Sequence, residues 1–496
     1  MKPHLHGRDA LGKVNEGRMA SATKFSGLAS DSRDVKPGYL FAALPGTQAD
    51  GRIFIADAVR RGAVAVLGRP EARTEVDRLG VCFIADENPR ARLARFAAAF
   101  YGIQPSIVAA VTGTNGKTSV AVFLRQIWTS LGHPAASMGT IGVTSPSGEI
   151  ALKHTTPDPI EIHSLLARLK RDGVDRLALE ASSHGLDQFR LDGVQIVAGG
   201  FTNITRDHLD YHADFSAYLA AKLRLFSELV KSGGVAVINA DAGYAREFVA
   251  AAKERGLDVL TVGVSGEGLR LVSYSAQGDG HTLAVAYRGK TYDVVLPLAG
   301  KFQISNALVA AGLAIALGDP AEDVFAALAH LRGAAGRLEK VAYAHSGASI
   351  YVDYAHTPDA LETVLTALRP HVTGKLHVVF GCGGDRDRGK RPLMGAIAAR
   401  QADTVIVTDD NPRGEEPATI RVEILAGCPA AREIADRAKA IRTAIAGLQS
   451  GDILVVAGKG HESGQIVGTE VLPFSDRAEA IEAALSLGGQ LVRGGS

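Results

Sequence analysis

The sequence has little cysteine and no long hydrophobic run. Its 496 residues include three cysteines, Cys82, Cys382 and Cys428, which are far apart and match neither a zinc-binding pattern nor a disulfide framework. No apolar stretch approaches the ~20 residues that span a bilayer, and the N-terminal segment lacks the apolar core of a secretory signal. These absences predict a cytoplasmic protein that is not inserted in a membrane.

An excess of one charge is also missing. Lys plus Arg (54) nearly balance Asp plus Glu (53), so there is no strong basic field to attract nucleic acid. No repeat with a period of roughly 20–50 residues is present, which excludes a solenoid. Domains of roughly 100–200 residues predict about three for a chain of this length.

Apolar runs alternate with helical patterns along the chain. The first α/β domain is expected at residues 1–104, the second at 105–335 and the third at 336–496. The third contains the runs SIYVDYA, LHVVFG, TVIVTDD and DILVVAG, separated by helical patterns. This alternation predicts an α/β fold whose parallel sheets are covered by helices on both faces.

A glycine-rich loop follows the expected strand at 107–112. The segment Gly113 to Ser119, GTNGKTS, precedes a helical pattern, so its backbone N–H groups can surround a phosphate. Lys117 can reach the terminal phosphates and the Thr118 hydroxyl can hold Mg²⁺. Val111 stands where the longer motif has a glycine, so this is a shortened variant. The alternative is a glycine turn that binds nothing.

Such a loop also occurs in other classes of protein. A GTPase should carry an N-K-x-D motif, which is missing here, and GCGG at 381–384 is not the G-x-G-x-x-G of a dehydrogenase. A nucleotide-regulated binding protein that uses the loop as a switch remains a rival. A ligase would differ from it by releasing phosphate only when both substrates to be joined are present.

Other polar residues lie near the loop in the predicted sheet. Glu180 ends the strand RLALE, where a carboxylate can hold Mg²⁺. The segment TNITRDHLDYH (202–212) follows a further strand, although single histidines there could be surface residues. Lys222 shares a helix face with Tyr218 and Phe226, and by itself it is expected to be a surface lysine.

Taken in order, these segments resemble the Mur ligases, which build the peptide of peptidoglycan. The further segments that carry the resemblance are DSR (31–33), GTQADGR (46–52), HTTPD (154–158), EASSHGLDQFR (180–190), YLAAKLRLF (218–226), GKFQISN (300–306), GRLE (336–339), VDYAHTPDAL (352–361), GCGGDRDRGKRP (381–392), DDNPRGEEP (409–417) and GKGHE (458–462). The resemblance implies three domains that bind a UDP-sugar peptide, ATP in a P-loop ATPase-like sheet, and an amino acid in a Rossmann-like C-terminal domain. It also implies that ATP phosphorylates the carboxylate of UDP-MurNAc-L-Ala-D-Glu, and that an amine then attacks the acyl phosphate to give an amide, ADP and phosphate.

The resemblance implies roles for individual residues. Lys117, Lys222 and His208 are expected to be catalytic. ATP contacts are expected from Gly113, Thr114, Asn115, Gly116, Lys117, Thr118, Ser119, Asn306, Arg337 and Asp353. Mg²⁺ ligands are expected at Thr118, Glu180, His208 and Lys222, the last as a carbamate formed with CO₂. Contacts to the UDP-sugar peptide are expected from Ser30, Ser32, Thr47, Gln48, Ala49, His154, Thr155, Thr156, Ser182, Gln188 and Arg190.

The segment DNPR bears on which amino acid is added. meso-Diaminopimelate has a distal carboxylate that lysine lacks, and a guanidinium can bind it through two parallel hydrogen bonds. Arg413 supplies this group, and DNPR resembles the signature of the diaminopimelate-adding members. Contacts to diaminopimelate are expected from Arg386, Asp410, Asn411, Pro412, Arg413, Gly458 and Glu462. A surface-loop arginine is the alternative interpretation of Arg413.

A second NPR, Asn88 to Arg90, matches no substrate site and is predicted to be a turn with a solvated arginine. The nearest enzyme rivals are the ligase that adds D-Ala-D-Ala and folylpolyglutamate synthetase. DNPR and GTQADGR argue against both. The chain is expected to act as a monomer.

Overall fold

The computed structural model describes residues 25–46, 50–205, 207 and 211–492. Four predicted site residues, Thr47, Gln48, Ala49 and His208, lie outside these ranges, so their roles stay predictions. Residue contacts divide the chain into two compact units, the first formed mainly by residues up to Leu260 and the second mainly by residues from Thr261.

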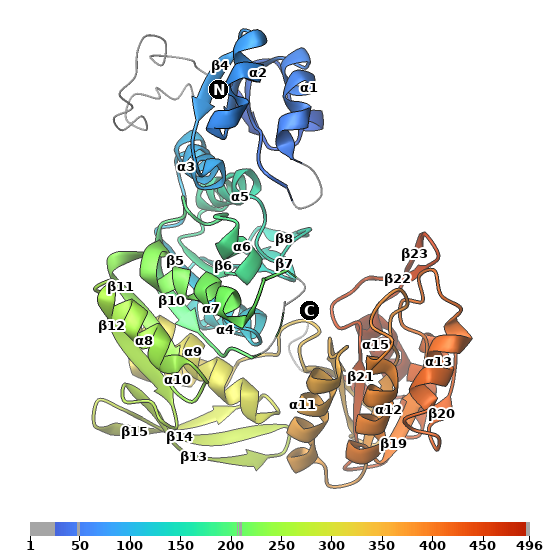
Figure 1. Cartoon of the computed structure of the whole chain (residues 1–496). Helices are drawn as coiled ribbons and strands as arrows, with labels where there is room; N and C mark the ends of the chain where they lie inside the picture. The colour runs from blue at the N-terminus through green and yellow to red at the C-terminus, as the bar shows by residue number, and fades with distance from the viewer. Residues whose placement is uncertain (1–24, 47–49, 206, 208–210, 493–496) are drawn as a thin grey trace. The chain divides into compact units, whose positions relative to one another are not determined.

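The first unit begins with a small parallel sheet. Its strands follow in the order β1 (Gly27–Ala29), β2 (Tyr39–Ala42), β3 (Ala63–Gly68) and β4 (Cys82–Ala85). Its helices are η1 (Ser32–Asp34), η2 (Gly51–Phe54), α1 (Ile55–Arg60), η3 (Pro70–Ala72) and α2 (Arg73–Arg78). Helix α3 (Pro89–Tyr101) follows the sheet (Figure 1).

A larger sheet makes up the rest of the first unit. The strands of this sheet from β5 to β11 lie in the order β11-β10-β5-β9-β6-β7-β8. Their bounds are β5 (Ile107–Thr112), β6 (Ala135–Gly139), β7 (Gly142–Ser145), β8 (Gly148–Ile150), β9 (Arg176–Glu180), β10 (Ile196–Phe201) and β11 (Val230–Asn239). The helices in this part of the chain are α4 (Lys117–Ser130), α5 (Pro159–Arg171), α6 (Ser183–Asp187), α7 (Phe215–Arg224), the π-helix η4 (Leu225–Leu229) and α8 (Ala245–Glu254).

The second unit contains an antiparallel meander and a seven-stranded sheet. Strand β12 (Asp258–Gly263) leads to the meander β13 (Leu269–Gln277), β14 (Gly280–Tyr287) and β15 (Lys290–Leu296), followed by α9 (Lys301–Ala316) and α10 (Ala321–Leu328). The large sheet has the order β20-β19-β18-β21-β17-β16-β24. Its strands are β16 (Glu339–Tyr343), β17 (Ser349–Asp353), β18 (Leu376–Phe380), β19 (Thr404–Val407), β20 (Arg432–Glu433), β21 (Ile453–Ala457) and β24 (Gln490–Leu491).

Helices flank this second sheet (Figure 1). They are α11 (Pro358–Leu368), η5 (Arg369–His371), α12 (Lys390–Gln401), α13 (Pro417–Leu425), α14 (Arg437–Ala446) and α15 (Asp476–Ser486). Strands β22 (Gly464–Val467) and β23 (Glu470–Pro473) form a hairpin, and they pair with each other as a separate two-stranded sheet.

The buried strands explain why the sequence pattern predicted the fold class. Residues of β18 and β21 are buried throughout, as expected for parallel strands covered on both faces. The α/β prediction with parallel sheets is therefore confirmed. The domain boundaries at 104/105 and 335/336 stay predictions.

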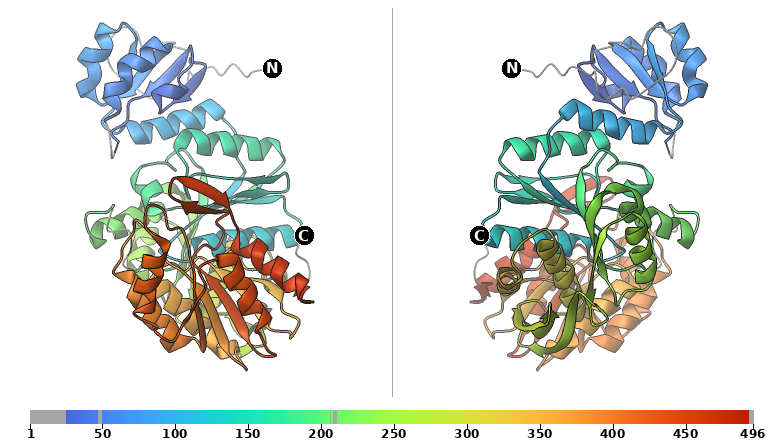
Figure 2. Two further views of the ribbon diagram at one scale, coloured as in Figure 1. Left: turned by 90° about the vertical axis from the view of Figure 1, so that its right-hand side faces the viewer. Right: turned by 90° about the vertical axis from the view of Figure 1, so that its left-hand side faces the viewer.

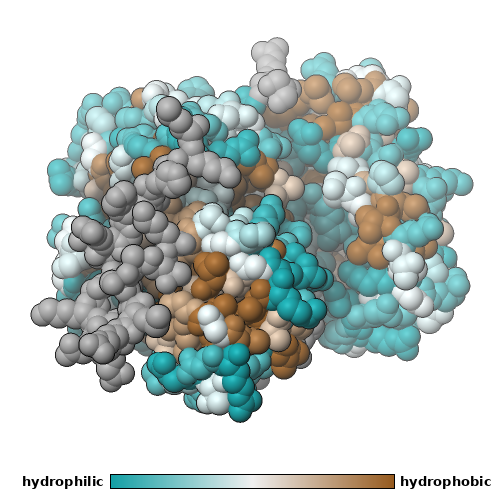
Figure 3. Space-filling model, turned by 90° about the horizontal axis from the view of Figure 1, so that it is seen from above, coloured by the Kyte–Doolittle hydropathy of each residue, from teal (hydrophilic) through white to brown (hydrophobic). Residues whose placement is uncertain are grey.

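No helix among the described residues is long and apolar enough to cross a membrane. On the face drawn in Figure 3, patches of apolar residues are bordered by hydrophilic ones.

Helices α3 and α5 lie side by side between the two sheets of the first unit (Figure 2). Gly193 fits tightly against both, because a Cβ there would lie 2.6 Å from the Ala94 carbonyl oxygen and 2.6 Å from His163 Nε2. His163 is 2% exposed, and burial lowers its pKa to about 4. This imidazole is therefore neutral at pH 7 and acts as a packing group.

The first prediction concerns this contact. Gly193→Ala should destabilise the protein by about 1–3 kcal/mol, because an added methyl group must push apart backbone and a buried ring. Thermal denaturation should show a Tm lowered by several degrees. Gly243→Ala is the matched control, since a Cβ there meets no atom within 4 Å. Equal Tm values for the two variants would contradict the prediction.

Candidate active site

The phosphate loop connects β5 to α4 and is held in shape by the segment after β10. The Thr114 N–H donates to the Asn203 carbonyl (2.8 Å), and the Thr202 hydroxyl donates to the Asn115 carbonyl (2.6 Å). Gly113 has φ +153°, and a Cβ there would lie 1.9 Å from Thr202 Oγ1. Only glycine therefore fits at this position.

Two lysines converge on the loop. Lys117 Nζ donates to the carbonyls of Gly113 and Thr114, both at 2.8 Å, and Lys222 Nζ donates to the Gly113 carbonyl at 2.7 Å. In α7, Lys222 is 1% exposed and its Nζ lies 4.6 Å from the centre of the Tyr218 ring. The expectation of a surface lysine, taken from the residue alone, is wrong because α7 turns this face toward the loop.

The electrostatics of Lys222 follow from this position. Burial, with a smaller contribution from Lys117, holds its pKa well below the usual value, and Asp207 acts in the opposite direction. A lowered pKa favours the neutral amine, which is the nucleophilic form of lysine. The Tyr218 hydroxyl, 2.9 Å from Thr114 Oγ1, joins α7 to the loop in the same place.

Glu180 lies next to the loop at the end of β9. In the register of the sheet it pairs with Val111, two residues before Gly113. Its carboxylate accepts from the Thr140 N–H (2.8 Å) and the Thr140 hydroxyl (3.1 Å). The carboxylate is thus fixed and buried near the loop, as a metal ligand must be.

Thr156 connects this region to the segment that follows. Its hydroxyl donates to the Glu180 carbonyl (2.9 Å) and accepts from the Ser182 N–H (3.1 Å). Arg190 donates to the Thr156 carbonyl at 2.5 Å and to Gln188 Oε1 at 2.8 Å. Thr155 joins through Thr140, whose hydroxyl lies 3.0 Å from the Thr155 hydroxyl.

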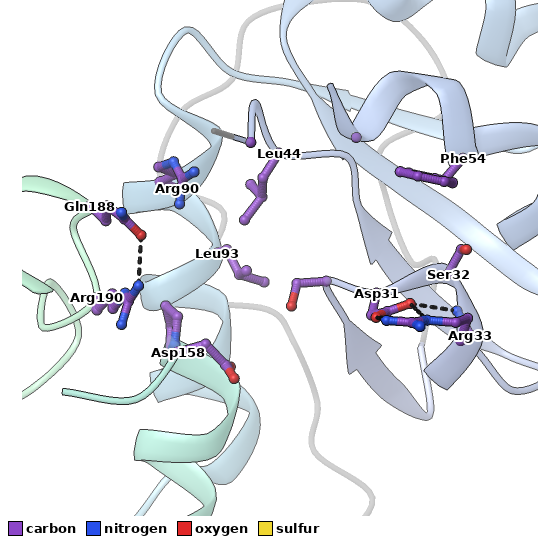
Figure 4. Close-up of a pocket in the computed structure, with 14 residues that line it drawn as sticks. Asp31, Ser32, Arg33, Leu44, Phe54, Arg90, Leu93, Asp158, Gln188 and Arg190 are labelled. Atoms are coloured by element: carbon purple, nitrogen blue, oxygen red, sulfur yellow. Dashed lines mark hydrogen bonds and ion pairs between the residues drawn. The ribbon is translucent and has the colours of Figure 1, made fainter. Parts of the chain in front are cut away.

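A cavity of about 570 Å³ continues from Arg190 toward the small parallel sheet. Figure 4 shows Asp31, Ser32 and Arg33 on one side and Gln188 and Arg190 on the other. Several residues predicted to contact the UDP-sugar peptide line it: Ser30, Ser32, Gln188 and Arg190. His154 is exposed and is not among the lining residues.

Arg90 also lines this cavity, so the prediction of a solvated arginine in a turn is wrong. The segment Asn88–Arg90 starts α3 rather than a loop turn. Asn88 caps the helix by accepting from the Ala91 N–H (3.1 Å), and Pro89 occupies its first position. Arg90 is half-buried and donates to the Pro45 carbonyl at 2.5 Å.

The three nucleotide residues predicted in the second unit form one polar group. Asn306 in α9 donates to Gln303 Oε1 (3.0 Å), and Gln303 donates to the Arg337 carbonyl (3.4 Å). The Arg337 guanidinium lies 4.6 Å from the centre of the Tyr354 ring. Asp353 ends β17 and accepts from the N–H groups of Leu338 (2.6 Å) and Ala355 (2.7 Å).

The predicted amino-acid residues gather at the ends of β19 and β21. Arg413 is half-buried, donates to the Gly384 carbonyl at 2.9 Å and has φ +51°. A Cβ on Gly458 would lie 2.6 Å from Asp410 Oδ2, so a larger residue would displace that carboxylate. Arg386 is exposed, and its guanidinium donates to the Asp385 carbonyl (3.4 Å).

Buried charges hold the Arg413 loop. Glu415 accepts from the fully buried Arg391 (2.8 Å) and from the Asp385 N–H (2.6 Å), and Asp385 accepts from the Gly414 N–H (2.9 Å). The hydrogen bonds from Arg391 and then Arg388 lower the pKa of Glu415 to about 2. The loop that carries Arg413 is therefore clamped to the segment after β18.

Lys459 is a residue of this cluster that the sequence analysis missed. It is fully buried, and its Nζ donates to Asn411 Oδ1 and to Glu462 Oε2, both at 2.9 Å. Asn411 also donates to Glu462 Oε2 at 3.0 Å. Its place inside GKGHE, between Gly458 and Glu462, was the available signal.

Family models match three successive parts of the chain. The model "Mur ligase family, catalytic domain" matches residues 24–101, "Mur ligase middle domain" matches 111–314, and "Mur ligase, glutamate ligase domain" matches 336–460. Relatives match it almost end to end. The UDP-N-acetylmuramoyl-L-alanyl-D-glutamate–2,6-diaminopimelate ligase of Bradyrhizobium diazoefficiens is 58% identical over 94% of this chain and 96% of its own length. The chain belongs to the Mur ligase family.

Further Mur ligases agree with this membership. The ligase of the same name from Caulobacter vibrioides is 56% identical over 92% of this chain and 95% of its own. A solved structure of a ligase of that name has a TM-score of 0.72 and 34% identity, and covers 96% of this chain and 97% of that one. The MurF ligase of Thermotoga maritima in complex with ADP shares the fold at 18% identity, with a TM-score of 0.57 over 93% of this chain and 96% of that one.

The second prediction concerns Asp353 of this Mur ligase. Burial raises the pKa of its carboxyl from 3.8 to about 6, although Arg337 acts in the opposite direction. Between these two pKa values, the Asp353 carboxyl is therefore protonated in the folded protein but ionised in the unfolded chain. The free energy of unfolding from this group should fall as pH rises from about 4 to about 6, by about 3 kcal/mol.

Asp353→Asn should remove this component. The wild-type Tm minus the variant Tm should decrease between pH 4 and pH 6 and then stay level. Asp359→Asn, at an exposed position six residues later, is the control. A difference between the wild-type Tm and the Asp353→Asn Tm that increases with rising pH would contradict the prediction.

Proposed function

We propose that this chain is an ATP-dependent ligase that adds meso-2,6-diaminopimelate to UDP-MurNAc-L-Ala-D-Glu in cytoplasmic peptidoglycan precursor synthesis. The names and the 50–58% identities of the curated relatives support the substrates. The observation that carries the proposal is a run of polar residues in the first unit. Glu180 ends β9 beside β5, which leads into the phosphate loop, and hydrogen bonds connect the Glu180 carbonyl through Thr156 to Arg190, which lines the cavity.

In this proposal, each of the three domains binds one substrate. Residues 1–104 bind the UDP part, 105–335 bind ATP, and 336–496 bind the incoming amino acid, with the protein acting as a monomer. Thr47, Gln48, Ala49 and His154 are kept as proposed contacts to the UDP-sugar peptide, and His208 as a proposed metal ligand.

Lys117 and the loop N–H groups hold and orient the phosphates of ATP in this proposal. The lysine contributes a cation where negative charge develops on the transferred phosphoryl group. The carboxylate of D-glutamate attacks the γ-phosphorus, ADP leaves, and an acyl phosphate forms. The amine of diaminopimelate then displaces phosphate and loses a proton to give the amide.

The donor set around the loop suits Mg²⁺, which prefers oxygen ligands. Glu180 offers a buried carboxylate and Thr118 a hydroxyl at the start of α4. Lys222 as a carbamate would supply a further anionic ligand, and its lowered pKa favours the neutral amine that reacts with CO₂. When bound, the ion would neutralise charge on the phosphates.

The third prediction concerns substrate choice. Phosphate release should require ATP, UDP-MurNAc-L-Ala-D-Glu and meso-diaminopimelate together, and L-lysine should be a poorer substrate by roughly 10⁴ in kcat/KM. The reason is that Arg413 pairs with the distal carboxylate of the diacid and repels the distal ammonium of lysine. A coupled phosphate assay with a panel of amino acids measures this.

Arg413→Ala should lose most activity with diaminopimelate without gaining activity with lysine. Wild-type enzyme that uses both amino acids equally well would contradict the proposed role of Arg413, while phosphate release without any amino acid would contradict the ligase proposal itself.

The fourth prediction concerns Lys459. Lys459→Met keeps the buried length of the side chain but removes the charge that holds Asn411 and Glu462. KM for diaminopimelate should rise about tenfold or more, with KM for ATP changed less than about twofold, because a bond to a charged group contributes about 1.5–3 kcal/mol. Lys439→Met, at an exposed position, is the control. An unchanged KM for diaminopimelate in a folded Lys459→Met variant would refute the positioning role.

A further inference from the structure

The cavity of the first unit contains a second arginine besides Arg190. Arg90 is the second residue of α3, and Figure 4 shows it on the same side of the cavity as Gln188 and Arg190. Both arginines are half-buried, and both line the cavity. Asn88 and Pro89 are explained by the start of the helix, but helix formation places no requirement on an arginine at position 90.

Carboxylates act on Arg90 and Arg190 only without direct pairing: Asp187 raises the pKa of Arg90, and Asp158, which lines the cavity, raises that of Arg190, both against the larger effect of burial. Neither guanidinium forms an ion pair with a described carboxylate, and their hydrogen bonds go to the carbonyls of Pro45 and Thr156 and to the amide of Gln188. Desolvation is the main cause that lowers the pKa of each, and Arg90 lowers that of Arg190 further.

Two partly buried cations with these partners favour the binding of an anion between them. Removing charge from water is costly unless a counter-charge compensates it. A guanidinium with a free edge binds phosphate or carboxylate through two parallel hydrogen bonds. The cavity of about 570 Å³ leaves room for such a ligand between the small sheet and the segment of Gln188 and Arg190.

We propose that Arg90 binds the diphosphate of the UDP-sugar peptide. This rests on the proposed function, and the position of Arg90 on the path of the substrate decides which anion it meets. Arg190 is bonded to Thr156, whose hydroxyl touches Glu180 near the phosphate loop, so it lies toward the peptide carboxylate. Arg90 is instead bonded to Pro45, next to Gly46 and on the side of the small sheet, where the uridine is expected.

The test is calorimetric binding without ATP or amino acid, which requires no catalysis. The probes are uridine, UMP, UDP and UDP-MurNAc-L-Ala-D-Glu. Arg90→Ala should weaken the binding of UDP and of the full substrate by about tenfold or more, as expected for a charge-assisted hydrogen bond, and leave uridine within about twofold. Arg90→Lys keeps the charge and should bind UDP better than Arg90→Ala.

Arg95→Ala is the matched control. It removes the same charge from the same helix, but Arg95 is exposed and does not line the cavity. If Arg90→Ala weakens the full substrate but not UDP, the residue contacts a carboxylate of the peptide and the proposal is wrong. If Arg90→Ala binds all four probes like wild type, the proposal is also wrong.

These outcomes separate Arg90 from the proposed function. Wild-type protein that binds neither UDP nor the full substrate would contradict both. Wild-type protein that binds UDP, with a loss confined to the Arg90 variants, supports the site whatever amino acid the enzyme adds. Melting curves of each variant establish that the cavity is folded.

Discussion

The carbonyl group of Gly113 is the point on which the proposed site depends. It accepts from Lys117 at 2.8 Å and from Lys222 at 2.7 Å, so one backbone atom brings two cations together at the phosphate loop. Two ammonium groups this close repel each other in a region shielded from water. Lowering the pKa of the more deeply buried Lys222 relieves part of this repulsion, and a phosphate or a carbamate would relieve more.

The residues around the phosphate loop are held mostly by hydrogen bonds between side chains and backbone groups. Thr202 and Asn203 fix the loop, Thr140 fixes Glu180, and Thr156 joins Glu180 to Ser182. In the second unit, the loop of Arg413 is held differently, by the side-chain ion pair between Arg391 and Glu415. The functional side chains are thus supported by neighbours whose own positions are already determined, which limits reorganisation when substrates bind.

Local patterns along the chain predicted the α/β class and the phosphate loop, and the resemblance to the Mur ligases supplied the other functional segments. The sequence could not predict that Lys222 is buried, since a single lysine on a helix does not reveal what the helix packs against. Arg90 was misinterpreted for a related reason. The tripeptide NPR was compared with DNPR at 410–413, although Asn88 and Pro89 serve to start a helix. Lys459 was missed because its importance arises from two partners, Asn411 and Glu462, which are 48 and 3 residues away.

The state of Lys222 tests the account most directly. Purified enzyme equilibrated with ¹³C-labelled bicarbonate should show a carbamate resonance in its ¹³C NMR spectrum, and this resonance should be missing from Lys222→Ala. The signal should persist in Lys439→Ala, whose lysine is exposed. An active wild-type enzyme with no carbamate resonance, or one whose resonance survives in Lys222→Ala, would contradict the proposal that this buried amine becomes the anionic ligand beside the phosphate loop.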